Sequence, residues 1–337
     1  MGTPRALWQQ LALIALQTSG ITSAADFSSS CIGVETGKPG LPVLNRDYSL
    51  NPGQQFIEER QAFGISNLKK EERKLGGMLP TTTLEFPANA YNLALVLWLF
   101  FQTGVSEAGT SPYMKTAIPY TSPVCEVWAS IADPITGAIT SGNNEAIHGA
   151  IISSWTLSGE ENGQLKISAE FVGRQFVKDF SDADGVLTVS TQAGLLYRNT
   201  NISLDGNTVY CPSFSITFSH NVESPAYNGQ YPRKHVLHDL EITGEIVIPR
   251  DSGSAAEDNE AQITDLLAGD DKRLKIDVGG HNPASAEGDI ALDMDILYKE
   301  KEKVSEAEIG TRLPFEQVAG SNDLSITCAD GIQRNIP

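Results

Sequence analysis

Several stretches of the chain alternate between apolar and polar residues, the pattern of a strand with one buried face and one solvated face. Residues 154–158 and 165–171 both alternate in this way, and the pair Asn162–Gly163 between them favours a tight hairpin turn. The same alternation returns at 213–219 and 290–296. These runs predict a mainly β protein built from antiparallel strands, with few helices.

Two segments depart from this pattern and predict short helices. The first runs from Asn89 to Gln102 and the second from Glu257 to Leu267, each with a glycine close behind as a stop signal. The continuous apolar part of the first segment is about ten residues long, which is too short to span a bilayer. We therefore expect a helix that packs against the core.

The order of these parts recurs along the chain. In each half a strand is followed by a polar loop, a strand that ends in proline (Pro87 or Pro249), a short helix and a hairpin region. Such a recurrence favours an internal duplication. We expect two β-barrel or sandwich domains at 1–183 and 184–337, each with a flanking short helix and a long loop. The loop of the first domain spans residues 51–77 and carries charges of both signs.

The charge of the chain limits its partners. Its 42 acidic and 24 basic residues give a formal net charge of -18. Such a surface repels a phosphate backbone, which disfavours tight nucleic-acid binding but suits a wall past which DNA slides. The four cysteines stand singly, without a CxxC pair, and indicate neither a zinc site nor a disulfide scaffold.

No catalytic, cofactor-binding or metal-binding site is predicted, and we do not expect an enzyme. The sequence has no phosphate loop, nucleophile elbow or zinc-protease signature. His235 and His238 are three residues apart in a predicted strand, so they point to opposite faces and do not suit one ion. Asp293 and Asp295 share a strand face, but no aromatic residue accompanies them to bind a sugar, so a solvated face is preferred.

The N-terminus supports two interpretations. Its apolar run Leu11–Leu16, followed by small residues at 23–25, imitates a secretion signal. The run is short and glutamines precede it, which favours a strand that leads into a turn. A secreted, acidic β-sandwich that serves in binding or adhesion therefore stays open as the alternative function, and N-terminal sequencing of the mature protein would separate the two.

The stretch from Leu11 to Lys178 resembles the tail tube proteins of long-tailed bacteriophages. The resemblance is carried by an N-terminal strand and turn, a motif in the long loop, a strand ending in proline, a helix and a hairpin. These are Leu13-Ile-Ala-Leu-Gln-Thr-Ser-Gly20, Phe63-Gly-Ile-Ser66, Thr82-Thr-Leu-Glu-Phe-Pro87, Tyr91-Asn-Leu-Ala-Leu-Val-Leu97 and Trp155-Thr-Leu-Ser-Gly159. The second half is similar through Asn201-Ile-Ser-Leu-Asp-Gly206, Phe214-Ser-Ile-Thr-Phe218 and Leu240-Glu-Ile-Thr-Gly-Glu-Ile246, although its loop is shorter and its helix less apolar.

The resemblance implies a structural virion protein, the major tail tube subunit, whose rings stack into a hollow conduit for DNA delivery. Single-barrel relatives form hexameric rings, so a two-barrel chain is expected to close as a trimer with pseudo-sixfold symmetry. Inner hairpins of neighbouring barrels would pair edge to edge into one lumen sheet. The expected lumen-facing residues are Ser154, Thr156, Ser158, Ser168, Glu170, Asp293 and Asp295. The expected ring-to-ring contacts are Glu58, Glu59, Arg60, Lys69, Lys70, Glu71, Glu72, Arg73 and Lys74.

The resemblance also implies partners and a location. The partners are copies of the chain itself, the tape measure protein and other tail proteins, with DNA only passing through the lumen without sequence-specific contacts. The location is the virion tail, after assembly in the host cytoplasm and without a membrane. The tube protein of a type VI secretion system also assembles barrels into rings, but it has a single barrel and a much shorter chain. A hydrolase on a β scaffold has no supporting residues.

Overall fold

The computed structural model describes residues 12–16, 38–41, 50–58, 73–101, 105–108, 111–115, 125–129, 145–178, 187–189, 194–226, 229–249, 269, 271–279, 290–299, 302–303, 310–318 and 324–328. Within these ranges the protein consists mostly of β-strands, which pair antiparallel with a single parallel exception, together with one α-helix and one short 3-10 helix. The predicted mainly β fold is confirmed.

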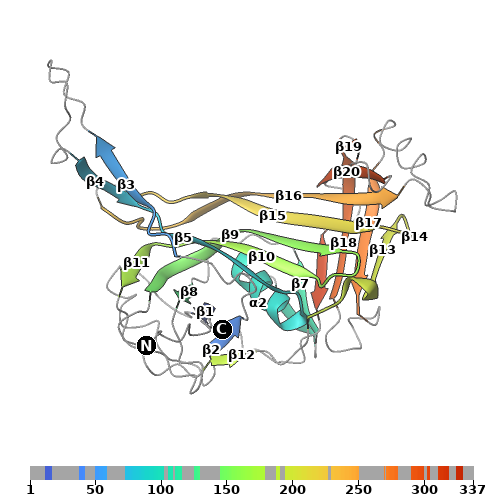
Figure 1. The fold of residues 1–337 in the computed structure, drawn as a ribbon, viewed down its shortest axis with the longest axis horizontal. Helices are drawn as coiled ribbons and strands as arrows, with labels where there is room; N and C mark the ends of the chain where they lie inside the picture. Colours follow the sequence, from blue (N-terminus) through green and yellow to red (C-terminus); the bar gives the residue numbers. More distant parts are fainter. Residues whose placement is uncertain are drawn as a thin grey trace, which may run out of the picture.

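Six strands form a central sheet, whose long strands extend along the molecule and whose last strand lies at one end of it (Figure 1). In spatial order they are β5 (Thr81–Pro87), β10 (Lys166–Val172), β9 (Glu145–Glu160), β15 (Ser213–Glu223), β16 (Val236–Pro249) and β20 (Gly310–Gln317). Two long hairpins, β9–β10 and β15–β16, make its centre. The second half of β9 pairs with β15 from Ser154 opposite Ser219 to Glu160 opposite Ser213, so strands from both halves of the chain belong to one sheet.

Two further sets of strands extend the sheet at its ends. The first set continues from the early part of β9 and comprises β1 (Ala12–Leu16), β2 (Lys38–Leu41), β8 (Cys125–Ala129), β11 (Gln175–Lys178) and β12 (Leu187–Val189). The second set continues from β20 and comprises β6 (Val105–Ala108), β7 (Ser111–Lys115), β13 (Thr200–Leu204), β14 (Asn207–Val209), β17 (Lys272–Val278), β18 (Ile290–Tyr298), β19 (Glu302–Lys303) and β21 (Ser325–Cys328). The 3-10 helix η2 (Tyr197–Asn199) directly precedes β13. In Figure 1 strands β17, β18 and β20 cross the end of the long strands steeply.

Helix α2 (Ala90–Phe101) follows β5 and confirms the helix expected at Asn89 to Gln102. Asn89 caps it, because its side-chain oxygen accepts a hydrogen bond from the backbone N–H of Asn92 at 2.8 Å. Among the described residues, no helix is long and apolar enough to cross a membrane.

The core lies between α2 and the apolar face of the central sheet. Phe100 of the helix meets Trp155 of β9 edge to face, with ring centroids 6.3 Å apart. Trp155 in turn stacks on Phe218 of β15 at 4.1 Å. All three side chains are almost completely buried. This aromatic group therefore holds the helix and both hairpins together.

Several other expectations can be placed. The predicted hairpin over 154–171 is confirmed as β9–β10, and the apolar run near the N-terminus forms β1, which pairs with β8 and β2 as a strand. The helix expected at Glu257 to Leu267 lies outside the described residues, as does the expected domain boundary at Asp179–Gly185.

The stretch 51–77, expected to be a long loop, begins and ends as a β-hairpin. Strands β3 (Gln54–Glu58) and β4 (Arg73–Met78) pair antiparallel, with Glu58 opposite Arg73. We call these two strands the arm, because they project from one end of the central sheet (Figure 1). Charged residues break the alternation over this stretch, which is why the pattern of apolar residues did not predict strands there.

Candidate functional site

One face of the central sheet is polar over all six strands. Residues directly opposite each other in paired strands share a face, and the strand registers align three rows of side chains across the sheet. The rows are Glu85–Ser168–Thr156–Thr217–Thr243–Glu316, Pro87–Lys166–Ser158–Ser215–Glu245–Pro314 and Thr83–Glu170–Ser154–Ser219–Glu241. All of these residues are exposed or half-buried. We call these three rows the polar face.

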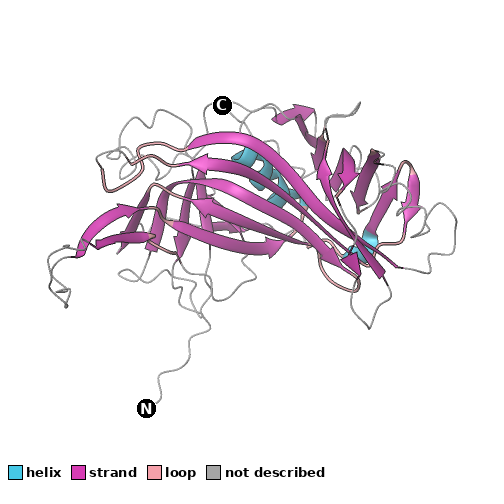
Figure 2. Cartoon of the chain, turned by 90° about the horizontal axis from the view of Figure 1, so that it is seen from above, coloured by secondary structure: helices cyan, strands magenta, loops and turns pink. Residues whose placement is uncertain are grey.

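Among the described elements, none lies over the polar face. Helix α2 lies on the opposite side of the long strands (Figure 1), and Figure 2 shows the broad surface of these strands with the helix beside and behind them. No described strand or helix covers the rows between the arm at one end and β20 at the other. In the part of the chain that the structure describes, the three rows are therefore left exposed or half-exposed along the two hairpins.

Hydroxyl groups fill the centre of the polar face. The Thr156 and Thr217 hydroxyls lie 2.8 Å apart across the β9–β15 junction and share a hydrogen bond. Nearby, the Ser154 hydroxyl donates to a Glu170 carboxylate oxygen at 3.1 Å. Each hydroxyl oxygen has a second lone pair, which can bind water. The centre of the sheet thus presents hydroxyl groups that can bind water.

Carboxylates surround this hydroxyl centre. The three rows contain five glutamates, at positions 85, 170, 241, 245 and 316, and only one lysine, Lys166. Two cations reach in from the side of β20, where Arg312 lies 3.5 Å from Glu245 and Lys299 lies 2.6 Å from Glu316. The hydrogen bond to Glu316 raises the pKa of Lys299 above its ordinary value. With five carboxylates against three cations, the face keeps a small excess of negative charge, which disfavours adhesion of a phosphate backbone.

Five of the seven residues expected to face a lumen lie together on the polar face, namely Ser154, Thr156, Ser158, Ser168 and Glu170. The other two, Asp293 and Asp295, lie on β18 among the strands that cross the end of the sheet. Asp293 accepts two hydrogen bonds from Arg273 at 2.8 and 2.6 Å, and Asp295 is only 6% exposed. The structure does not bring these aspartates to the hydroxyl centre.

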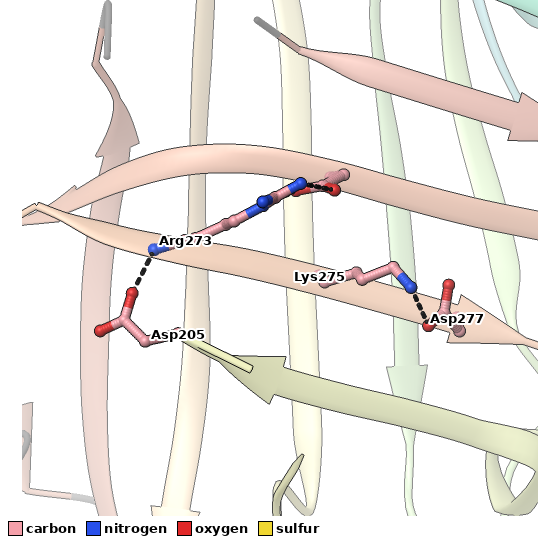
Figure 3. A network of polar contacts seen from close by, with 5 residues as sticks. Asp205, Arg273, Lys275 and Asp277 are labelled. Carbon is pink, nitrogen blue, oxygen red and sulfur yellow. Dashed lines mark hydrogen bonds and ion pairs between the residues drawn. The ribbon is translucent and has the colours of Figure 1, made fainter. Parts of the chain in front are cut away.

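These aspartates belong to a region of structural ion pairs (Figure 3). Asp205, in the turn between β13 and β14, accepts a hydrogen bond from the backbone N–H of Arg273 at 2.9 Å and pairs with Lys272 at 2.8 Å. Partial burial raises the pKa of Asp205, but these hydrogen bonds and the charge of Lys272 outweigh it, so the net pKa is lowered. Lys275 pairs with Asp277 on the same strand at 2.8 Å. The network ties β17 to its neighbours.

Sequence reasoning missed the second-half members of the polar face. Ser215, Thr217 and Ser219 alternate with buried Ile216 and Phe218 in the same way as the first-half residues alternate. The alternation was visible in the sequence, but the pairing of β9 with β15 was not, so nothing placed the two runs side by side. Glu241, Thr243 and Glu245 follow from the next strand in the same register.

Three of the residues expected to make ring-to-ring contacts, Glu58, Arg73 and Lys74, lie on the arm. Glu58 and Arg73 are opposite each other in the β3–β4 register, and Lys74 is opposite Ile57. The remaining candidates, Glu59, Arg60, Lys69, Lys70, Glu71 and Glu72, lie outside the described residues. The described part of the charged stretch therefore belongs to the strands of a projecting hairpin.

The two histidines considered for a metal have separate partners. The His235 ring lies 3.2 Å from the carbonyl oxygen of Gly149 and 2.8 Å from the Ser224 hydroxyl, whereas His238 pairs with Glu223 at 3.3 Å. Within the part of the chain that the structure describes, no group of three or more histidine, cysteine or acidic side chains could hold a metal ion.

Comparison with known protein families gives a match that covers most of the chain. A family model described as phage tail tube protein matches residues 20–318, a range that includes both long hairpins, the arm and α2. No curated protein matches the chain. Because the family match covers most of the sequence, the chain belongs to the phage tail tube protein family.

Proposed function

We propose that this chain is the major tail tube subunit, that its copies close into stacked rings, and that the polar face lines the channel through which DNA leaves the virion. The observation that carries the proposal is the polar face itself, an uncovered, hydroxyl-rich and acidic surface that runs in one register across strands from both halves of the chain.

Ring closure follows from how the hairpins are joined. Within the chain, β9 and β15 connect the two hairpins edge to edge. The outer edge of β16 is paired with β20 only from Thr243 onward, so among the described strands none pairs with this edge from Val236 to Ile242. A neighbouring chain can extend the sheet there, which also protects an open strand edge. Three chains with two hairpins each give the six units of a trimeric ring with pseudo-sixfold symmetry.

The chemistry of the polar face suits passage of a polyanion. Hydroxyl groups bind water, and the glutamates repel phosphate, so DNA passes over a hydrated wall without sequence-specific contacts. The tape measure protein would occupy the same channel before DNA is ejected. On this proposal the subunits assemble in the host cytoplasm and end up in the virion tail with other tail proteins.

The arm is proposed to connect one ring with the next. It projects beyond the end of the central sheet, and its sequence carries closely spaced charges of both signs between Glu58 and Lys74. Opposite charges at fixed spacing favour one docking register and penalise others. Reversing the charges of Arg73 and Lys74 together should therefore reduce stacking of rings without preventing ring closure.

Electron microscopy of the purified full-length chain tests the proposal. Negative-stain images should show hollow rings and tubes, and a cryo-EM map of the tube should place Thr156 and Thr217 on the wall of the channel. A protein that stays monomeric over a wide range of concentrations would contradict tube formation. A tube with these two threonines on its outer surface would contradict the assignment of the polar face.

A further inference from the structure

The arm is fixed to the central sheet by a tight crossing at its base. Asn51 and Thr81 exchange two backbone hydrogen bonds of 2.9 Å, which joins the segment before β3 to the start of β5. The Asn51 side chain also accepts a hydrogen bond from the backbone N–H of Gly53 at 2.9 Å. The carbonyl oxygen of Gly53 then accepts one from the N–H of Leu79 at 3.3 Å. The arm therefore leaves the sheet through a short, hydrogen-bonded neck.

Gly53 is required at this neck for two independent reasons. Its φ of +59° lies in the left-handed region that other residues adopt at a cost. A Cβ atom at this position would also overlap the backbone carbonyl of Leu79. Gly77, on the other strand of the arm, provides a contrast, since a Cβ there would be 4.0 Å from the carbonyl oxygen of Gln230, which is an ordinary contact.

A segment from the second half of the chain supports the neck. Residues 229–235, which we call the seat, belong to the connection between β15 and β16. The carbonyl oxygen of Gln230 accepts a hydrogen bond from the N–H of Met78, at the end of β4, at 2.7 Å. The Gln230 side-chain amide lies 3.3 Å from the sulfur of Met78. The second half of the chain therefore contacts the base of the first half's arm directly.

The seat is itself held in place by the first half. Arg174, just after β10, donates a hydrogen bond to the carbonyl oxygen of Pro232 at 3.1 Å. The His235 ring lies 3.2 Å from the carbonyl oxygen of Gly149 on β9. The seat is thus fixed at Pro232 and His235 to the segment after β10 and to β9, and the arm is fixed to the seat through Met78.

We infer that Gly53 and the seat are positioning elements that set the direction of the arm before rings meet. This inference rests on the proposed role of the arm in ring stacking. An arm held in its docking direction loses little conformational freedom on contact, whereas a loose arm would have to be ordered at that moment. The partner of the positioned arm is a second copy of this chain in the adjacent ring.

The test compares full-length wild-type protein with Gly53→Ala and the matched variant Gly77→Ala. Hydrogen exchange of residues 54–58 and 73–78 reports the order of the arm, analytical ultracentrifugation reports rings, and light scattering with electron microscopy reports tube elongation. Gly53→Ala should still form rings but should lose hydrogen-exchange protection in the arm. It should elongate tubes about tenfold more slowly, which corresponds to an added cost of about 1.4 kcal/mol for docking the arm. Gly77→Ala should match the wild type in all three measurements.

Elongation of Gly53→Ala at the wild-type rate would overturn the inference, and so would an equal slowing in Gly77→Ala. Should Gly53→Ala fail to fold, the seat can be tested through the double variant Gln230→Ala with Arg174→Ala. This double variant should slow tube elongation by roughly threefold, a smaller effect than that expected for Gly53→Ala. Lys234→Ala, an exposed residue of the same segment, should have no effect, and equal rates for these two variants would contradict the role of the seat.

The outcome can be separated from failure of the proposed function. If the wild-type chain forms neither rings nor tubes, the tube proposal fails. Hydrogen exchange on the unassembled subunit still decides whether Gly53 orders the arm, because the comparison of Gly53→Ala with Gly77→Ala does not require assembly. Equal protection of the arm in both variants would then overturn the positioning role by itself.

Discussion

The two long hairpins of the central sheet share one alternation of polar and apolar residues but are closed in different ways. A tight turn joins β9 to β10, with Asn162 at a φ of 62°. A long connection joins β15 to β16, and its residues 229–235 lie against the first half of the chain. In both hairpins, alternating polar and apolar residues give the strands one buried and one solvated face. The connections differ in length and in the part of the chain that each contacts. Strand pattern and hairpin closure are therefore separable properties of this fold.

The two hairpins meet at a junction whose opposite faces perform different tasks. On the apolar face, Trp155 of β9 is opposite Phe218 of β15 and stacks on it. One residue further along, on the polar face, Thr156 is opposite Thr217 and shares a hydrogen bond with it. The apolar pair should contribute most of the stability, and the polar pair should matter mainly for the surface that it presents.

The largest effect is expected from Trp155→Ala, which removes the side chain that both hairpins and α2 share. Deleting a buried aromatic residue costs about 3 to 5 kcal/mol of unfolding free energy, measurable by urea denaturation of the unassembled subunit. Trp155→Phe is the control. It keeps an aromatic ring and removes an indole N–H that has no hydrogen-bond partner among the described residues, so it should cost about 1 kcal/mol. Equal losses in the two variants would contradict the stacked junction as the source of stability.

The second effect concerns the long connection and acid. Burial lowers the pKa of His235 from 6.5 to about 4, the charge of Arg174 adds to this, and the hydrogen bond to Gly149 acts in the opposite direction. Above pH 6.5 the histidine is neutral in both the folded and the unfolded state, so its contribution to the free energy of unfolding is complete. As pH falls toward 4, the unfolded chain binds a proton that the folded chain does not, which removes up to about 3 kcal/mol of stability.

Denaturation at several pH values, compared between the wild type and His235→Gln, isolates this contribution from that of the carboxylates. The difference in stability between the two proteins should change between pH 6.5 and 4 and stay constant above pH 7. A constant difference over the whole range would show that His235 is not buried as the structure has it.

The third effect concerns the tight turn. Asn162→Val places a β-branched residue in the left-handed region, which should cost about 1 to 2 kcal/mol. Asn162→Gly adopts the same conformation freely and should leave stability nearly unchanged. Thermal unfolding of both variants tests this, and equal stabilities would mean that the turn can adopt another conformation without loss.

The smallest effect is expected on the polar face. Thr156→Val keeps the shape of the side chain, removes one hydrogen bond with Thr217 and should cost about 1 kcal/mol or less. The subunit should fold and form rings as before, as judged by denaturation and ultracentrifugation. A loss as large as that of Trp155→Ala would show that the polar pair, and not the aromatic pair, holds the hairpins together.

Local patterns in the sequence predicted the β9–β10 hairpin, the alternation at 213–219, the helix after β5 and five residues of the polar face, because each depends on neighbours within one strand or one turn. Ser154 and Glu170, for instance, follow directly from alternation with Trp155 and Phe171. The partners across the β9–β15 junction could not be predicted in this way. Nothing local in Thr156 or Thr217 indicates that they meet, since about sixty residues separate them along the chain.

Two expectations differed from the structure for physical reasons. Residues 54–58 and 73–78 pair as strands although charged residues interrupt their apolar pattern, because pairing of backbone groups does not require a buried face. Asp293 and Asp295 show the same alternation as the polar face. However, Asp293 accepts hydrogen bonds from Arg273, and Asp295 is buried. Alternation reports that one side of a strand is polar but not what that side contacts.

The junction between β9 and β15 has a kinetic consequence for assembly. In a ring built from three such chains, every second contact between hairpins is already made within one polypeptide, so it forms at an effective concentration set by the chain and not by the bulk solution. Nucleation of such a ring requires three molecules to meet. A ring of single-hairpin subunits would require six. Such a ring can form at a lower protein concentration, and its rate of formation should rise with a lower power of that concentration.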